Sequence, residues 1–128
     1  MADLPDEANP TTGSVSYVDP EGLHKTPAFT NAVDSSSDIV GKGDVAAQTR
    51  QVVENLRAAL VAGGAGPEHV VKWNLHVVEG QPLQAGFAAF QNAWPETPSP
   101  PAITMAFVAG LANPDFLVEM DAVAVVPL

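Results

Sequence analysis

Apolar residues recur at helical spacing in the middle of the chain. They or Thr occupy positions 45, 49, 52, 53, 56 and 60, which lie on one face of a helix of 3.6 residues per turn. Asp44 precedes this stretch as a favourable N-cap residue, and the pair Gly63 and Gly64 follows it as a stop signal. The pattern predicts a helix over Val45–Ala62 that buries one face.

Strict alternation of apolar and polar residues follows. Val71, Trp73, Leu75 and Val77 are separated by Lys72, Asn74 and His76. A period of two is typical of a strand that has one buried face. We therefore expect a strand over Val70–Val78 with Val71 on the same apolar face as Trp73.

A second helix and two further strands complete the pattern. Pro82 can begin a helix whose apolar side carries Leu83, Phe87, Phe90 and Trp94. A loop rich in proline follows, and then two stretches typical of strands, Ala102–Val108 and Phe116–Val126. Before the first helix, Val15–Val18 could form one short strand.

The order of these elements predicts an α+β fold with two helices packed on one face of a small mixed sheet. Residues 15–128 are expected to form a single domain, preceded by a flexible acidic arm at residues 1–14. The other face of the sheet mixes polar and apolar residues. Another copy of the chain could cover such a face, although periodicity does not give the number of copies.

Charge and composition exclude several classes of function. The formal net charge is −10, and no Lys or Arg follows Lys72. Nucleic acid and anionic membranes are disfavoured because both require a basic surface. The chain has no cysteine, and His24 and His69 have no partners at metal-ligand spacing, so we expect no metal site. Without a signal-peptide pattern or a long apolar run, a cytoplasmic protein is expected.

The candidate chemical groups lie on two strands. Glu119 and Asp121 are two residues apart, so both carboxylates share a face, where they could do acid–base chemistry or form a solvated or interfacial surface. His76 beside Asn74 could be a general base or simply a hydrogen-bonded residue at an interface. These residues alone leave both pairs of alternatives open.

Several blocks of the sequence resemble the RidA/YjgF family. They include the helix start Ala47-Gln48-Thr49-Arg50-Gln51 and the ending Val118-Glu119-Met120-Asp121-Ala122. The similar blocks keep the family's order and spacing over roughly residues 23–127. The resemblance implies a chorismate-mutase-like fold and a homotrimer whose sheets line a central barrel, with small-molecule clefts between subunits.

The resemblance also implies an activity and a set of site residues. Family members with the best-known activity hydrolyse reactive enamines or imines to a keto acid and ammonia, without a cofactor or a metal. Glu119 matches the family's glutamate, which positions or activates water. Gln84 falls where many members have an asparagine that lines the cleft, and Phe29 falls near a family tyrosine.

The chain departs from the family in two places. Ile103 stands where the family has an arginine that pairs with the substrate carboxylate, so deamination of 2-imino acids is not expected. A strand that family members place after the segment equivalent to residues 29–33 is absent around Asn31–Val33, through either a true deletion or a loop omitted from the sequence.

Three functions remain to be compared. The first is a deaminase-like hydrolase for less anionic enamines, imines or carbonyl compounds, with Glu119 as general acid or base and Ile103 making part of the cleft apolar. The second is a trimer that binds small metabolites or acts as a scaffold without chemistry. RNA cleavage, also attributed to this family, is the weakest because of the net charge of −10.

Overall fold

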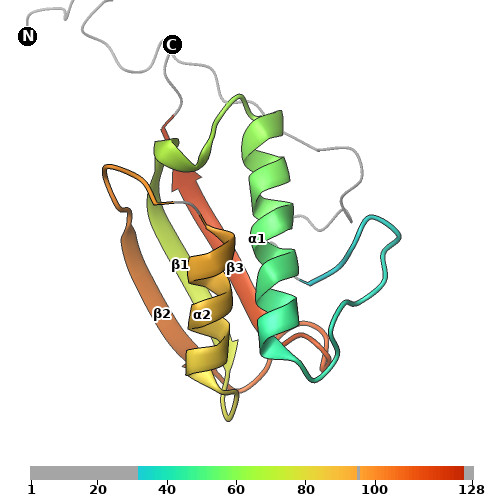
Figure 1. Cartoon of the computed structure of the whole chain (residues 1–128). Helices are drawn as coiled ribbons and strands as arrows, with labels where there is room; N and C mark the ends of the chain where they lie inside the picture. The colour runs from blue at the N-terminus through green and yellow to red at the C-terminus, as the bar shows by residue number, and fades with distance from the viewer. Residues whose placement is uncertain (1–31, 95, 126–128) are drawn as a thin grey trace, which may run out of the picture.

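The computed structural model describes residues 32–94 and 96–125. Helix α1 (Val45–Ala62) is followed by a short 3₁₀ turn at Pro67–His69 and by strand β1 (Val70–Val78). Helix α2 (Leu83–Ala93), strand β2 (Ala102–Val108) and strand β3 (Val118–Ala124) complete the described part of the chain. Figure 1 shows these elements in order.

The three strands form one mixed sheet. Strand β1 lies in the centre, parallel to β2 and antiparallel to β3. Both helices cover the same face of this sheet, with α2 in front of β1 and β2 in Figure 1 and α1 nearer β3. The predicted α+β architecture, with two helices on one face of a mixed sheet, is confirmed.

Helix α1 begins and ends where its pattern predicts. The Asp44 carboxylate accepts a hydrogen bond from the backbone N–H of Ala47 at 3.1 Å, as an N-cap residue should. At the other end Gly64 adopts φ +78°, a backbone conformation that glycine tolerates without steric cost. The N–H of Ala65 then donates to the carbonyl of Leu60 at 2.8 Å, which closes the helix.

The core lies between the helices and the sheet and is centred on three aromatic rings. Trp73 of β1 is fully buried, and its ring packs edge-on against those of Phe90 and Trp94. The ring centroids of Trp73 and Trp94 are 4.5 Å apart. Edge-to-face contacts of this kind add to the free energy gained from burying apolar area. The aromatic face of α2 is therefore fastened to the central strand.

Two expectations about the buried faces are wrong in part. The pairing of β1 with β3 shifts between Val70 and Lys72, so a β-bulge there changes which side chains face inward. Val70 is buried, whereas Val71, expected inside, is 48% exposed. On α2, Phe90 and Trp94 pack inward, but Phe87 is 53% exposed because no described element covers the outer side of β2 and α2.

Gln48 ties the start of α1 to the start of β3. Its side chain is fully buried, and its Nε2 donates to the carbonyl of Asp115 at 2.8 Å. Its Oε1 accepts from the N–H of Leu117 at 2.8 Å. Buried polar groups need partners, and this one amide satisfies two backbone groups from a distant segment. The helix therefore holds the chain in place just before β3 begins.

The segment that precedes α1 forms a short loop against the helix. Val33 and Ile39 pair as an isolated antiparallel bridge, and the Asp34 carboxylate accepts from the N–H groups of Ser36 and Asp38. The side chain of Asn55 donates to the carbonyl of Val33 at 2.8 Å. In the described part of the chain this bridge stands where the family resemblance implies a strand.

Some expectations concern residues that the structure does not describe. The acidic arm at residues 1–14, the short strand Val15–Val18, Phe29 and the end of the last strand at Val126 lie outside the described residues. The described portion of the last strand is Val118–Ala124, two residues later at its start than expected. None of the described helices has the length and apolar character needed to cross a lipid bilayer.

Replacing Gln48 tests the tie between α1 and β3. We expect Gln48→Met to lower the free energy of unfolding by about 2–3 kcal/mol, because it leaves the N–H of buried Leu117 without its acceptor. Urea unfolding followed by circular dichroism measures this change. Gln84→Met makes the same substitution at an exposed helical position and should change stability by less than about 0.5 kcal/mol. Equal effects of the two substitutions would contradict this role of Gln48.

Candidate functional site

The face of the sheet that the helices leave uncovered carries a row of polar side chains. His76 of β1 lies opposite Glu119 of β3, and Asn74 lies opposite Asp121. The Nδ2 of Asn74 donates to Oδ1 of Asp121 at 2.8 Å. These pairs arise because directly opposed residues of antiparallel strands project to the same side. The sheet thus brings together the four polar residues that the sequence singled out.

Apolar and polar side chains share this uncovered face. The ammonium group of Lys72 donates to the hydroxyl of Thr104, which ties β1 to β2. Ala106, beside His76, and Val123, opposite Lys72, complete the surface around the polar row. Val123 is 53% exposed. A face of this composition suits contact with another protein surface better than full solvation.

The surroundings of Glu119 shift its titration. Partial burial raises its pKa above the ordinary value of 4.5, because removing water penalises the charged form. His76 opposes this shift, and the neighbouring Asp121 adds to it by repulsion. A carboxyl group with a raised pKa exchanges protons more readily near neutral pH, which is the property required of a general acid or base.

Ile103 occupies a different region, a hollow of about 390 Å³ beside the first half of β2. Its side chain is 55% exposed and points to the helix side of the sheet, because it pairs in register with buried Trp73. The hollow is otherwise lined by α2, by the loop after it and by the central strand: Trp73, Phe87, Phe90, Gln91, Trp94, Glu96, Thr97, Pro100 and Pro101. Glu96 is the only charged residue among these described lining residues.

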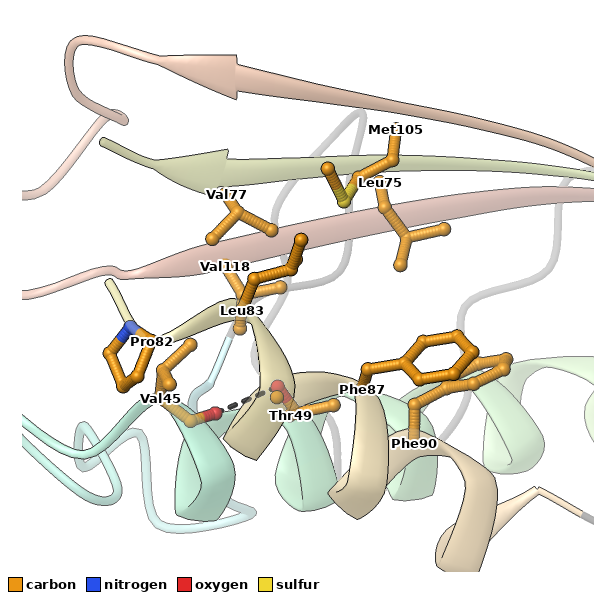
Figure 2. Close-up of a pocket in the computed structure, with 11 residues that line it drawn as sticks. Val45, Thr49, Leu75, Val77, Pro82, Leu83, Phe87, Phe90, Met105 and Val118 are labelled. Carbon is orange, nitrogen blue, oxygen red and sulfur yellow. Dashed lines mark hydrogen bonds between the residues drawn. The ribbon is translucent and has the colours of Figure 1, made fainter. Parts of the chain in front are cut away.

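A smaller apolar pocket of about 40 Å³ adjoins this hollow (Figure 2). Figure 2 shows Leu75 and Met105 of the sheet facing Leu83 and Phe87 of α2. Thr49 contributes a hydroxyl group to the lining of this pocket, and this hydroxyl donates a hydrogen bond to the carbonyl of Val45 at 2.7 Å. Since that donor is already used, the pocket offers a ligand little besides hydrocarbon contact. Phe87 and Phe90 line both spaces.

The structure does not bring all the predicted site residues together within one chain. Glu119 and Ile103 lie on the two strands that flank β1, and their side chains project from opposite faces of the sheet. Gln84 is exposed in the first turn of α2, on the helix side of the sheet. Phe29 lies outside the described residues. A site that contains both Glu119 and Ile103 therefore needs a second copy of the chain.

The aromatic hollow is the feature that reasoning from the sequence missed. Helical spacing predicts that Phe87, Phe90 and Trp94 lie on the buried side of their helix, and the sequence predicts only a loop rich in proline after it. A signal was nevertheless present, because the proline-rich loop 96–101 directly follows the aromatic helix. Proline fixes φ, so such a loop can hold an open wall beside the rings.

Among the described residues, no three His, Asp or Glu side chains gather closely enough to hold a metal ion.

Comparison with known proteins identifies the family of the chain. The model of the endoribonuclease L-PSP family matches residues 28–126. A RutC family protein of Synechocystis is 38% identical over 89 residues, which cover 70% of this chain and 67% of the relative. The chain belongs to this family, which includes the RutC and Rid/YjgF proteins.

Solved structures of the family share the fold. A Rid family protein of unknown function from Yersinia pestis is 29% identical, with a TM-score of 0.62 over 97% of this chain and 96% of that protein. TdcF of Escherichia coli, solved with bound serine, is 22% identical, with a TM-score of 0.69 over 88% of this chain and 90% of TdcF. The chorismate-mutase-like fold that the sequence resemblance implied is confirmed.

The raised pKa of Glu119 predicts a dependence of stability on pH. The folded chain holds the Glu119 proton more tightly than the unfolded chain, so this stabilisation is present below pH 4.5 and is lost as the pH rises through the folded pKa. Glutamine resembles the protonated carboxyl group and does not titrate. We therefore expect Glu119→Gln to match the parent in free energy of unfolding near pH 4 and to exceed it near pH 8.

Urea unfolding at a series of pH values measures this difference. Glu54→Gln, at an exposed position of α1, is the matched control and should track the parent at every pH. If the parent gains stability over Glu119→Gln as the pH rises, the carboxylate is stabilised in the folded state and the argument from burial is wrong.

Proposed function

We propose that this protein adds water to small enamines, imines or related carbonyl metabolites in a cleft formed between copies of the chain. Glu119 of one copy is the general acid or base, and Ile103 of a neighbouring copy lines the substrate's side of the cleft. The observation that carries the proposal is the half-buried Glu119 with a raised pKa, at the position of the family's water-activating glutamate.

The reaction needs one group that can both accept and return a proton. Water attacks the carbon of the C=N bond and gives up a proton, and the nitrogen must be protonated before ammonia can leave. One molecule of imine and one of water then yield one carbonyl compound and one ammonia. A carboxyl group whose pKa lies closer to neutrality performs both transfers better than an ordinary one. The proposed chemistry requires neither a metal nor a cofactor.

A homotrimer is the assembly that this proposal adopts from the family resemblance. Two features of the described residues support association of copies. Glu119 and Ile103 project from opposite faces of one sheet, so only separate copies can offer them to one substrate. The uncovered face also combines hydrogen-bonded polar pairs with an exposed valine, Val123. The structure of TdcF contains serine, which supports a role for this fold in binding small amino compounds.

Ile103 separates the proposed substrates from 2-imino acids. An aliphatic side chain cannot form the paired hydrogen bonds by which arginine holds a carboxylate. Among the described residues that line the hollow around Ile103, none is basic. The substrates should therefore lack a carboxylate next to the C=N bond. The net charge of −10 also opposes RNA as a substrate, because no basic stripe is present to contact phosphates.

Imine hydrolysis can be measured directly. An amine oxidase generates an imine without a carboxylate in situ, and an amino-acid oxidase generates a 2-imino acid. Ammonia and carbonyl product are followed with and without the protein. We expect acceleration of the first reaction only. Glu119→Gln should reduce that acceleration by about 100-fold or more, the range expected for loss of a general acid or base. Glu54→Gln should retain it.

A second variant tests the role of Ile103. Ile103→Arg restores the group that pairs with a carboxylate, so it should gain hydrolysis of the 2-imino acid. Binding of small amines or carbonyl compounds without any turnover would contradict the proposed chemistry and support a trimer that only binds metabolites. Full activity of Glu119→Gln would remove Glu119 from the mechanism.

A further inference from the structure

The hollow beside Ile103 has the size and wall composition of a binding site in its own right. Its volume of about 390 Å³ lies within the range of roughly 300–1,000 Å³ found for small-molecule sites. Phe87, 53% exposed, and Ile103, 55% exposed, offer apolar surface at its mouth. Pro100 and Pro101 also line the hollow. Hydrocarbon contact is therefore the main interaction that this space can offer.

The tryptophans of the hollow offer a ligand no hydrogen-bond donors. Trp73 and Trp94 both contribute to its wall, but their indole nitrogens are buried away from solvent. Neither indole N–H has an acceptor among the described residues. A ligand therefore meets chiefly the exposed ring of Phe87, because Trp73 is fully buried and Trp94 is only 9% exposed. Aromatic rings attract cations as well as other rings.

The described lining of the hollow is negatively charged. Glu96, exposed in the loop that follows α2, is the only charged side chain among the described lining residues. No described basic residue lines the hollow to offset it. A carboxylate beside aromatic rings favours a positively charged group, whereas a bound anion would have to approach Glu96 without any compensating cation.

We propose that this hollow binds a small primary ammonium or iminium ion with an aromatic or branched hydrocarbon body. The body lies against Phe87, Phe90 and Ile103, and the cationic nitrogen faces Glu96. The inference rests on the proposed function in one respect, since Ile103 belongs to both sites. The inference narrows the class of substrates to imines formed by oxidation of simple amines. When such an imine is protonated, its nitrogen carries the positive charge that Glu96 attracts. Glu96 is then a residue that determines specificity.

Binding of a ligand in this hollow can be followed by the intrinsic tryptophan fluorescence of the protein. The chain has two tryptophans, and both contribute to the wall of the hollow. Three probes of similar shape differ in charge: 2-phenylethylamine is cationic, 2-phenylethanol is neutral and phenylacetate is anionic. Each is titrated into the full-length protein at pH 7 while tryptophan fluorescence is followed. We expect the amine to bind most tightly and phenylacetate most weakly.

Two variants test which side chains determine the preference for the amine. Glu96→Gln should weaken binding of the amine by about two- to fivefold, as expected for a solvent-exposed charge pair, and leave binding of the alcohol unchanged. Ile103→Arg should reverse the order, so that phenylacetate binds more tightly than the amine. Glu79→Gln, an exposed carboxylate at the end of β1, is the matched control and should leave all three affinities unchanged.

The outcomes separate this inference from the proposed function. If none of the probes changes the fluorescence, or if the amine loses its advantage over phenylacetate in the parent protein, the inference is overturned. It is also overturned if Glu96→Gln leaves the affinity for the amine as it was. If the amine preference and its loss in Glu96→Gln are found without any imine hydrolysis, the binding inference stands and only the proposed chemistry fails. If imine hydrolysis is found without a preference for the amine, the proposed chemistry stands and the binding inference fails.

Discussion

The alternation of side chains across a β-strand is the constraint on which this site depends. Trp73 and His76 are three residues apart on β1, so they project to opposite faces of the sheet. Ile103 shares the face of Trp73, and Glu119 shares the face of His76. No rotamer change can move either side chain through the sheet. Chemistry that needs both residues is therefore chemistry between chains.

Helix α1 fixes the chain just before the strand that carries Glu119. Gln48 binds the N–H of Leu117, two residues before Glu119. Because Val118 and Met120, the neighbours of Glu119 in β3, are buried on the helix side, alternation along the strand directs Glu119 to the uncovered face. The partial burial that raises the pKa of Glu119 follows from that placement. A buried amide of helix α1 thus fixes the chain before β3, and the buried neighbours within β3 set the face on which Glu119 lies.

Local patterns predicted most of the fold. The bounds of α1 and β1 agree with those expected, because capping residues and strict alternation are signals that lie within the element itself. The bulge that turns Val71 outward depends on the pairing of β1 with β3, which no local pattern contains. Burial of Gln48 was missed for a similar reason, since its partners at residues 115 and 117 come from a distant part of the chain.

The site was less predictable than the fold. Helical spacing correctly predicted that the aromatic side of α2 packs inward at Phe90 and Trp94, but it could not show that Phe87 lies beyond the edge of the covering elements. The role of Glu96 depends on where the loop after α2 lies relative to β2. That position is a matter of tertiary structure.

The most direct test of the account is a cross-linking measurement between positions 103 and 119. The chain contains no cysteine, so one chain carrying Ile103→Cys and another carrying Glu119→Cys can be mixed, reassembled and treated with a short thiol-specific cross-linker. The account predicts covalent dimers in the mixture, and no cross-link within a chain that carries both substitutions and is diluted into excess parent protein. A protein that remains monomeric, or that cross-links only within one chain, would contradict it.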